Sequence, residues 1–292
     1  MKNLVKGLEM AADTRSLAER AVENLSPAQA AYRISRGRVR RPVDYMRYAE
    51  FEALLRDLSP AAGMTILDVS SPQWFSLCLA SRHPDVEFHY ANICEDELEP
   101  FRDIAQALGI QNLRYQKEDV REMRFAAGTF DRVVSISVVE HVYPEDGGDV
   151  NALREIHRVL KPGGEFLFTV PYKTKSNIVY KEGAVYERKA EGRNFYAREY
   201  DEGTFRELVE KSDFALAGSW VICEKGGVFP VDYYEWGPGR DRAWAKTLVG
   251  FRKVLERKLG KSLDEALARH YLQVSREVVG RPVNIAARML KK

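Results

Sequence analysis

From Met64 onward, short apolar runs alternate with amphipathic helices. Five runs have the length and the β-branched or aromatic content of buried strands: Met64–Val69, Val86–Ala91, Leu113–Gln116, Phe130–Ser137 and Glu165–Val170. Between these runs, apolar residues recur every three or four positions, which is the spacing of one helix face. Strands that alternate with helices in this way predict an α/β fold: a parallel sheet with helices on both faces and right-handed crossovers.

The segments on either side of this core also carry regular patterns. We expect residues 1–60 to form an N-terminal helical cap and residues 61–292 to form the main domain. A helical insertion is expected at about residues 230–281. The individual elements predicted in these flanks are a helix face of Phe51, Leu54, Leu55 and Leu58, strands at Leu216–Cys223 and Val283–Leu290, and helices at Ala243–Leu259 and Ser262–Arg276.

Composition excludes several classes of protein. The chain has 292 residues, 45% of them hydrophobic and 30% charged, which supports a large core. The formal charge of +2 gives no reason to expect a nucleic-acid or membrane partner. No apolar run reaches the roughly 18 residues of a membrane span, and the N-terminus lacks the apolar core of a signal peptide. The three cysteines and five histidines show no disulfide or metal-ligand spacing, so we expect no metal and a reducing, cytoplasmic setting.

Two segments each allow two interpretations. The basic run Arg33–Arg41 either binds a phosphate or another anion or is a solvated loop between helices. The segment at about 172–200 is rich in aromatic residues, and it either forms a lid over a substrate pocket or simply packs a cap.

Ligands of an open α/β sheet bind beyond the carboxyl ends of its strands. Here that rule predicts a site built from five loops: Ser70–Trp74, Asn92–Ile93, Asp119–Val120, Ser137–His141 and Pro171–Tyr172. The pair Ser71-Pro72 begins a helix, and the helix N-terminus directs partial positive charge at the same crevice.

The order of motifs along this core resembles the class I S-adenosylmethionine (SAM) dependent methyltransferases, especially the type 11 group. The most specific stretches are FDRVVSISVVEHV, at the fourth strand, and LREIHRVLKPGGEFLFTVPY, which spans the next helix, turn and strand. The resemblance covers about Met64 to Pro171. It implies a Rossmann-like, seven-stranded, mostly parallel sheet with helices on both faces and an antiparallel last strand. It also implies SAM as the cofactor, bound across the first two strands, and S-adenosylhomocysteine (SAH) as the coproduct.

The resemblance also implies roles for individual residues at the cofactor site. Asn92, with Ile93 beside it, falls where an acidic residue normally binds the ribose hydroxyls. Asp119 falls where a side chain contacts the adenine amino group, with Val120 next to the ring. Ser137 and Val138 fall where the backbone approaches the methionine end. An ordinary turn residue is the alternative interpretation of Asn92.

The first motif departs from the family. Asp68 matches its acidic residue, but the glycines of Asp-x-Gly-x-Gly-x-Gly are absent, and the chain has Ser70, Ser71, Pro72 and Trp74 in that loop. Glycine normally allows positive φ and close approach of the backbone to a ligand. We expect a rebuilt loop in which the hydroxyls of Ser70 and Ser71 contact the cofactor. The alternatives are that Asp68 only satisfies the loop, and that SAM binding is lost.

These features predict a SAM-dependent methyltransferase that acts on an oxygen or nitrogen of a small-molecule acceptor. His141 and Tyr172 are the candidate general bases, although Glu140-His141 could equally be a polar pair that holds its loop. The alternative function is a methyltransferase-like binding or scaffold protein that no longer catalyses. A nucleic-acid methyltransferase would need a basic surface larger than one arginine run. The sequence does not define the oligomeric state.

Overall fold

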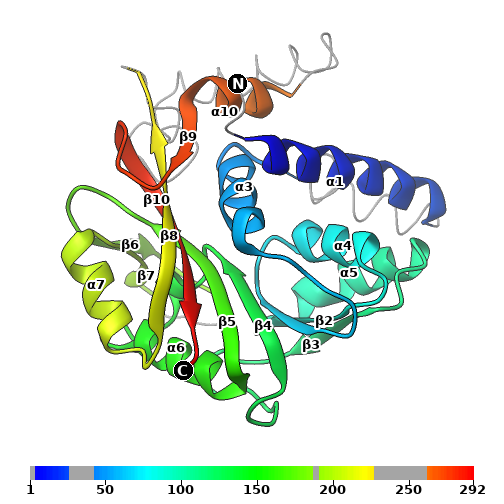
Figure 1. Ribbon diagram of the computed structural model, residues 1–292, viewed down its shortest axis with the longest axis horizontal. Helices are drawn as coiled ribbons and strands as arrows, with labels where there is room; N and C mark the ends of the chain where they lie inside the picture. Colours follow the sequence, from blue (N-terminus) through cyan, green and yellow to red (C-terminus); the bar gives the residue numbers. More distant parts are fainter. Residues whose placement is uncertain (1–3, 26–42, 187–190, 227–261) are drawn as a thin grey trace.

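The computed structural model describes residues 4–25, 43–186, 191–226 and 262–292. Their centre is one eight-stranded sheet in the order β3-β2-β1-β4-β5-β10-β8-β9 (Figure 1). The strands are β1 (Thr65–Val69), β2 (Glu87–Asn92), β3 (Leu113–Lys117), β4 (Phe130–Ile136), β5 (Leu160–Pro171), β8 (Ala215–Glu224), β9 (Leu272–Ser275) and β10 (Arg281–Leu290).

The first five strands pair in parallel, and β10 is antiparallel to both of its neighbours, β5 and β8. In the register of the central strands, Asp68 of β1 lies opposite Tyr90 of β2 and Val134 of β4. The parallel pairing brings the carboxyl ends of β1, β2 and β4 to one edge of the sheet. The predicted Rossmann-like architecture, with its antiparallel last strand, is confirmed.

The sheet has one strand more than the seven expected. A single helix was predicted over Ser262–Arg276, but α10 (Leu263–Tyr271) ends early and is followed by β9, which pairs antiparallel with β8. Ser262 accepts a hydrogen bond from the backbone of Glu265, which confirms the predicted helix start. Leu272 and Val274 of β9 are buried, and their alternation over four residues is too short to distinguish a strand from the end of a helix.

The helices cover both faces of the sheet, and neighbouring strand residues belong to different cores. Ile66 joins the core made with α1 (Val5–Asn24), α3 (Arg47–Asp57), α4 (Gln73–Arg82) and α5 (Glu95–Ala107). Leu67 joins the core made with α6 (Gly148–Val159) and α7 (Glu202–Glu210). The N-terminal helices therefore share one hydrophobic core with the sheet (Figure 1). The predicted helix face of Phe51, Leu54, Leu55 and Leu58 is buried there.

The aromatic segment at 172–200 contains a hairpin of β6 (Asn177–Glu182) and β7 (Arg193–Glu199), which forms a separate two-stranded sheet. The hairpin lies beside the loop that follows β4, where a short 3₁₀ helix, η1, spans Val139–His141. The basic run Arg33–Arg41 and the helix expected at Ala243–Leu259 lie outside the described residues.

Candidate functional site

A cavity of about 750 Å³ opens at the carboxyl ends of β1, β2 and β4. Its volume is within the usual range of small-molecule and cofactor sites. Eight of the residues singled out in the sequence line it: Ser70, Asn92, Ile93, Asp119, Val120, Ser137, Val138 and His141. Parallel strands bring their carboxyl ends together, so residues from four separate loops meet in one site.

The loop after β1 keeps a glycine-like conformation without glycine. Ser70 has φ +54°, in the left-handed region of backbone conformation. Residues other than glycine, asparagine and aspartate seldom adopt it. Its backbone N–H and its hydroxyl both donate to the carbonyl of Ala91 in β2, each at 2.9 Å. These two bonds hold the turn and leave Ser70 on the cavity wall.

Asp68 and Ser71 do not line the cavity described here, and both are buried beneath the loop. The Asp68 carboxylate accepts hydrogen bonds from the backbone N–H of Ser71, at 2.9 Å, and from the hydroxyl of Ser76. The hydroxyl of Ser71 accepts from the backbone N–H of Ile136 at 3.0 Å. Burial raises the pKa of Asp68 to about 6. Both residues shape the loop from below, so their predicted direct contact with the cofactor has no geometric support.

The bulky residue of the loop points away from the cavity. Trp74 is 3% exposed, and its ring packs edge-on against Phe101 of α5 at a centroid distance of 5.4 Å. Pro72 is the N-cap of α4. The replacement of the motif's glycines therefore does not fill the site, because the extra side-chain volume lies in the core between α4 and α5.

Two polar residues occupy the part of the cavity expected to hold the adenosyl group. Asn92 accepts a hydrogen bond from the backbone N–H of Cys94 through Oδ1, at 2.8 Å, so its amide group faces the site with a fixed orientation. Asp119 accepts from the backbone and the guanidinium of Arg121, each at 2.9 Å. Burial alone would raise the pKa of Asp119, but the hydrogen bonds and charge of Arg121 outweigh it, and the pKa is lowered.

Negative charge predominates on the cavity wall. Two cations, Lys117 and Arg121, line it together with five carboxylates: Glu95, Asp96, Glu97, Glu118 and Asp119. An excess of one charge on the walls of a cleft favours a ligand of the opposite charge. Three of the five carboxylates form ion pairs with arginines, so the excess of negative charge is smaller than the number of acidic residues.

His141 lies at the end of the cavity formed by η1. Its Nδ1 is 2.8 Å from the carbonyl oxygen of Tyr196 in β7. A carbonyl only accepts, so Nδ1 carries the proton and the lone pair is on Nε2. Nε2 lies 3.6 Å from the carboxylate of Glu140. Burial lowers the pKa of His141 to about 4, so the imidazole is neutral at physiological pH and its Nε2 can accept a proton.

Tyr172, the second candidate base, is placed elsewhere. Its ring packs edge-on against Phe205 of α7 at 6.2 Å, within the core on the other face of the sheet. Its backbone pairs with Tyr200, and it does not line the cavity that contains His141. A catalytic role for Tyr172 stays a prediction without support from its position.

Sequence reasoning missed Glu50, which α3 places beneath the cavity. Its Oε1 accepts hydrogen bonds from Ser137 Oγ at 2.5 Å, Thr169 Oγ1 at 2.7 Å and Asn284 Nδ2 at 2.9 Å. Its other oxygen pairs with Arg47 on the preceding turn. The one available signal was a carboxylate on the stripe that also carries Leu54, four positions later.

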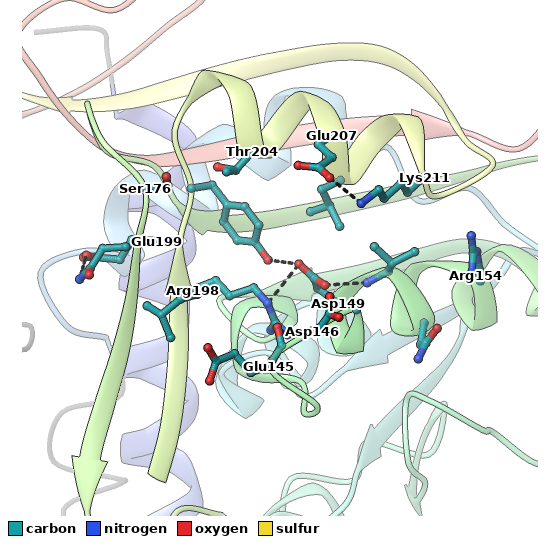
Figure 2. Close-up of a pocket in the computed structure, with 17 residues that line it drawn as sticks. Glu145, Asp146, Asp149, Arg154, Ser176, Arg198, Glu199, Thr204, Glu207 and Lys211 are labelled. Atoms are coloured by element: carbon teal, nitrogen blue, oxygen red, sulfur yellow. Dashed lines mark hydrogen bonds and ion pairs between the residues drawn. The ribbon is translucent and has the colours of Figure 1, made fainter. Parts of the chain in front are cut away.

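A second missed residue, Arg198 of β7, fastens the hairpin to the loop that carries the histidine. Its guanidinium donates to the carbonyls of Val142, Pro144 and Glu145, at 2.9, 2.6 and 2.7 Å. Figure 2 shows Arg198 directed at Asp149 of α6, and the Nε–Oδ2 distance is 3.3 Å. Arg198, Asp149 and Glu145 line a separate polar hollow of about 700 Å³ between α6, α7 and the hairpin. Through Arg198 the hairpin is thus bonded to the segment that follows His141.

Two absences hold for residues 4–25, 43–186, 191–226 and 262–292. Among those residues, no group of three or more His, Cys, Asp and Glu side chains is arranged to hold a metal ion. Within the same part of the chain, every helix is too short or too polar to cross a bilayer.

Comparison with known proteins was made on the sequence and on the fold. Residues 67–168 match the sequence profile of the family described as "Methyltransferase domain", type 11. No curated protein sequence matches the chain significantly. A protein from Bacillus halodurans proposed to be a methyltransferase superposes with a TM-score of 0.51 at 16% identity, over 82% of this chain and 96% of that one. The [4+2]-cyclase SpnF superposes with a TM-score of 0.51 at 14% identity, over 85% and 83%. At these identities the superpositions establish the fold alone.

Proposed function

We propose that the chain is a class I SAM-dependent methyltransferase, as the match of residues 67–168 to a methyltransferase domain supports, and that its acceptor is a small molecule methylated on oxygen or nitrogen. The observation that carries this proposal is the single cavity that contains both the polar residues Asn92 and Asp119 and the neutral imidazole of His141. A volume of about 750 Å³ leaves room for an acceptor beside a cofactor.

The residues of the cavity fit the cofactor. Asn92 and Asp119 would hold the ribose and adenine, and the backbone at Ser70 and Ser137 would approach the methionine end. The surplus of carboxylates on the wall offsets the positive charge of the bound group. SAM supplies a methyl group that its sulfonium already activates for transfer.

The protein then contributes placement and one proton transfer. The cavity would hold an acceptor beside the bound cofactor, and such placement lowers the entropic barrier of a two-molecule reaction. The hydrogen bond from Nδ1 of His141 to the carbonyl of Tyr196 leaves the lone pair on Nε2, which would take the proton that the nucleophile loses. Arg198 donates to the carbonyls of Val142 and Pro144, and these bonds hold the segment that carries the imidazole.

One observation favours a second candidate, a methyltransferase-like binding protein that no longer catalyses. The first motif contains no glycine, and an amide stands where the family has a ribose-binding acid. The open cavity, which Trp74 does not fill, argues against loss of cofactor binding, and an assay of methyl transfer separates the two candidates.

Thermal-shift titration with SAH and SAM, backed by calorimetry, tests the two candidates. Ligand at about 100 times its dissociation constant adds about 2.7 kcal/mol to stability. For a chain of this size that is a shift of several degrees, at about 2–4 °C per kcal/mol. Asp119→Ala should reduce the shift, whereas Glu207→Gln, in the separate polar hollow, should not. A saturable shift justifies an acceptor screen that follows SAH formation. No shift and no heat at millimolar ligand would make the binding protein the favoured candidate.

A further inference from the structure

The carboxyl end of β4 has a backbone conformation that needs external support. Ser137 has φ +52° and lines the cavity. A non-glycine residue in the left-handed region costs about 1–3 kcal/mol and persists only where its surroundings impose it. The groups that impose it should therefore be visible around Ser137.

Those groups converge on one oxygen atom. Glu50 Oε1 accepts from the hydroxyl of Ser137, in the loop after β4, from Thr169 of β5 and from Asn284 of β10. Thr169 Oγ1 also accepts from the backbone N–H of Ser137 at 3.1 Å, and the Thr169 carbonyl accepts from that N–H at 3.0 Å. The network therefore holds both the side chain and the backbone of Ser137.

The carboxylate at the centre is buried yet charged. Glu50 has no exposed surface, and its second oxygen forms an ion pair with Arg47, one turn earlier on α3. Separation of a buried ion pair is strongly unfavourable. The pair with Arg47 therefore holds the Glu50 carboxylate in one orientation. Both residues lie outside the segment 67–168 that matches the family, in the N-terminal helical part of the chain.

We propose that Glu50 is a positioning residue, which holds Ser137 in its left-handed conformation and so keeps the methionine end of the SAM site open. The assignment rests on the proposed use of this cavity for SAM. It also gives the N-terminal helix α3 a function beyond covering the sheet: the helix delivers the carboxylate that shapes the cavity floor.

The chain offers a matched control on the same helix. Glu52 is also buried, forms an ion pair with Arg56 at 2.9 Å and accepts from the backbone N–H of Gly7 in α1 at 3.0 Å. Neither glutamate lines the cavity, but Glu50 bonds to Ser137, which does. Glu50→Gln and Glu52→Gln therefore remove equivalent buried charges, and only the first disturbs Ser137.

The test measures SAH affinity by calorimetry in the full-length chain. We expect Glu50→Gln to weaken SAH at least about tenfold and Glu52→Gln to change it less than about twofold. Ser137→Gly, added to Glu50→Gln, should restore most of the affinity, because glycine adopts positive φ without support. A loss of affinity that arises only from reduced stability would not be rescued in this way. Equal affinities for the two single variants, or no rescue by glycine, would overturn the proposal.

A second measurement separates this proposal from the proposed function. Amide hydrogen exchange of the ligand-free protein should become faster at residues 136–142 in Glu50→Gln but not in Glu52→Gln. If the wild-type protein binds no SAH, the proposed function fails, and the exchange data alone decide the role of Glu50. If Glu50→Gln does not fold, Thr169→Val replaces it, since this change removes one donor to Glu50 and one contact to Ser137. Unchanged exchange at residues 136–142 in the folded variant would refute the role.

Discussion

Ser70 and Ser137 share the left-handed backbone conformation, at φ +54° and +52°, at the carboxyl ends of the adjacent strands β1 and β4. Both residues line the same cavity. Ser70 stands where the first motif of the family that the chain resembles has glycine, the residue that adopts this conformation most easily. The support comes from hydrogen bonds: to Ala91 for Ser70, and to Glu50 and Thr169 for Ser137.

The positive φ of Ser70 predicts that glycine at this position preserves stability and that valine lowers it. Ser70→Gly should change the free energy of unfolding by less than about 1 kcal/mol, because relief of strain offsets the lost hydroxyl bond to Ala91. Ser70→Val loses the same hydroxyl and forces a β-branched residue to positive φ, so it should cost about 1–3 kcal/mol more. Urea denaturation of the two variants gives the comparison. Equal stabilities would show that the turn relaxes to negative φ.

Much of the fold follows from local patterns. The strands around Asp68 and Val134 are short apolar runs between helices, and this alternation fixes a parallel sheet with both faces covered. The same topology explains why Asn92, Asp119 and Ser137 meet in one cavity, since each lies at or just beyond the carboxyl end of a parallel strand. Local patterns did not reveal β9, because four residues are too few for periodicity to decide.

The contributions that sequence reasoning missed are contacts between distant segments. Glu50 meets Thr169 and Asn284 only in the folded chain, across 119 and 234 residues. Tyr172 also follows a strand, yet its ring packs against α7 on the other face of the sheet, and a rule about strand ends does not specify which way a side chain points. The same rule does not specify the direction of Trp74, whose contact with Phe101 places it in the core.

The position of Trp74 separates stability from binding. Trp74→Ala should lower the free energy of unfolding by about 3–5 kcal/mol, since it leaves a cavity beside Phe101. Trp74→Phe should cost less than about 1.5 kcal/mol. SAH affinity should stay within about twofold of wild type in Trp74→Phe, as measured by calorimetry. A large gain in affinity for Trp74→Phe would mean that the tryptophan obstructs the site after all.

Asn92→Asp should strengthen SAH binding. The Oδ1 of Asn92 already accepts a hydrogen bond from the backbone of Cys94, and the amide carries no charge. A carboxylate would keep the bond to Cys94 and offer a charged acceptor to a hydroxyl, and such bonds are about twice as strong as neutral ones. We expect an affinity gain of several fold by calorimetry, with Asn151→Asp on α6 as the control. Weaker binding would mean that repulsion from neighbouring carboxylates such as Glu118 dominates.

Arg198 should matter for both stability and turnover. Arg198→Lys keeps the charge but loses the planar fork that reaches several carbonyls, so we expect a loss of about 2–3 kcal/mol in urea denaturation. The rate of methyl transfer should fall while SAH affinity changes little, because the affected loop carries His141 rather than Asn92. Arg154→Lys is the control: its ion pair with Asp213 is long, at 4.0 Å, and largely exposed. Similar effects in both variants would contradict the role of Arg198.

The pH dependence of His141 provides the last test. Its pKa is lowered by burial to about 4, against 6.5 for an unperturbed histidine, so the base should be neutral and active well below pH 6.5. The acid limb of the rate profile should accordingly lie near pH 4–5, and His141→Gln should lower kcat without weakening SAH. Between pH 6.5 and 4 the unfolded chain binds more protons at this residue than the folded chain, so acidification removes up to about 3 kcal/mol of stability.

Asp68 acts in the opposite direction, because its raised pKa of about 6 makes the folded chain bind more protons than the unfolded chain between pH 3.8 and 6. Asp68 is present in both proteins, so the difference between wild type and His141→Gln isolates the histidine. Denaturation measured from pH 7 to 4 should give a flatter stability curve for His141→Gln than for wild type. Parallel curves, or an acid limb at pH 6.5, would place the imidazole in water rather than against Tyr196 and would remove it as the buried base of this site.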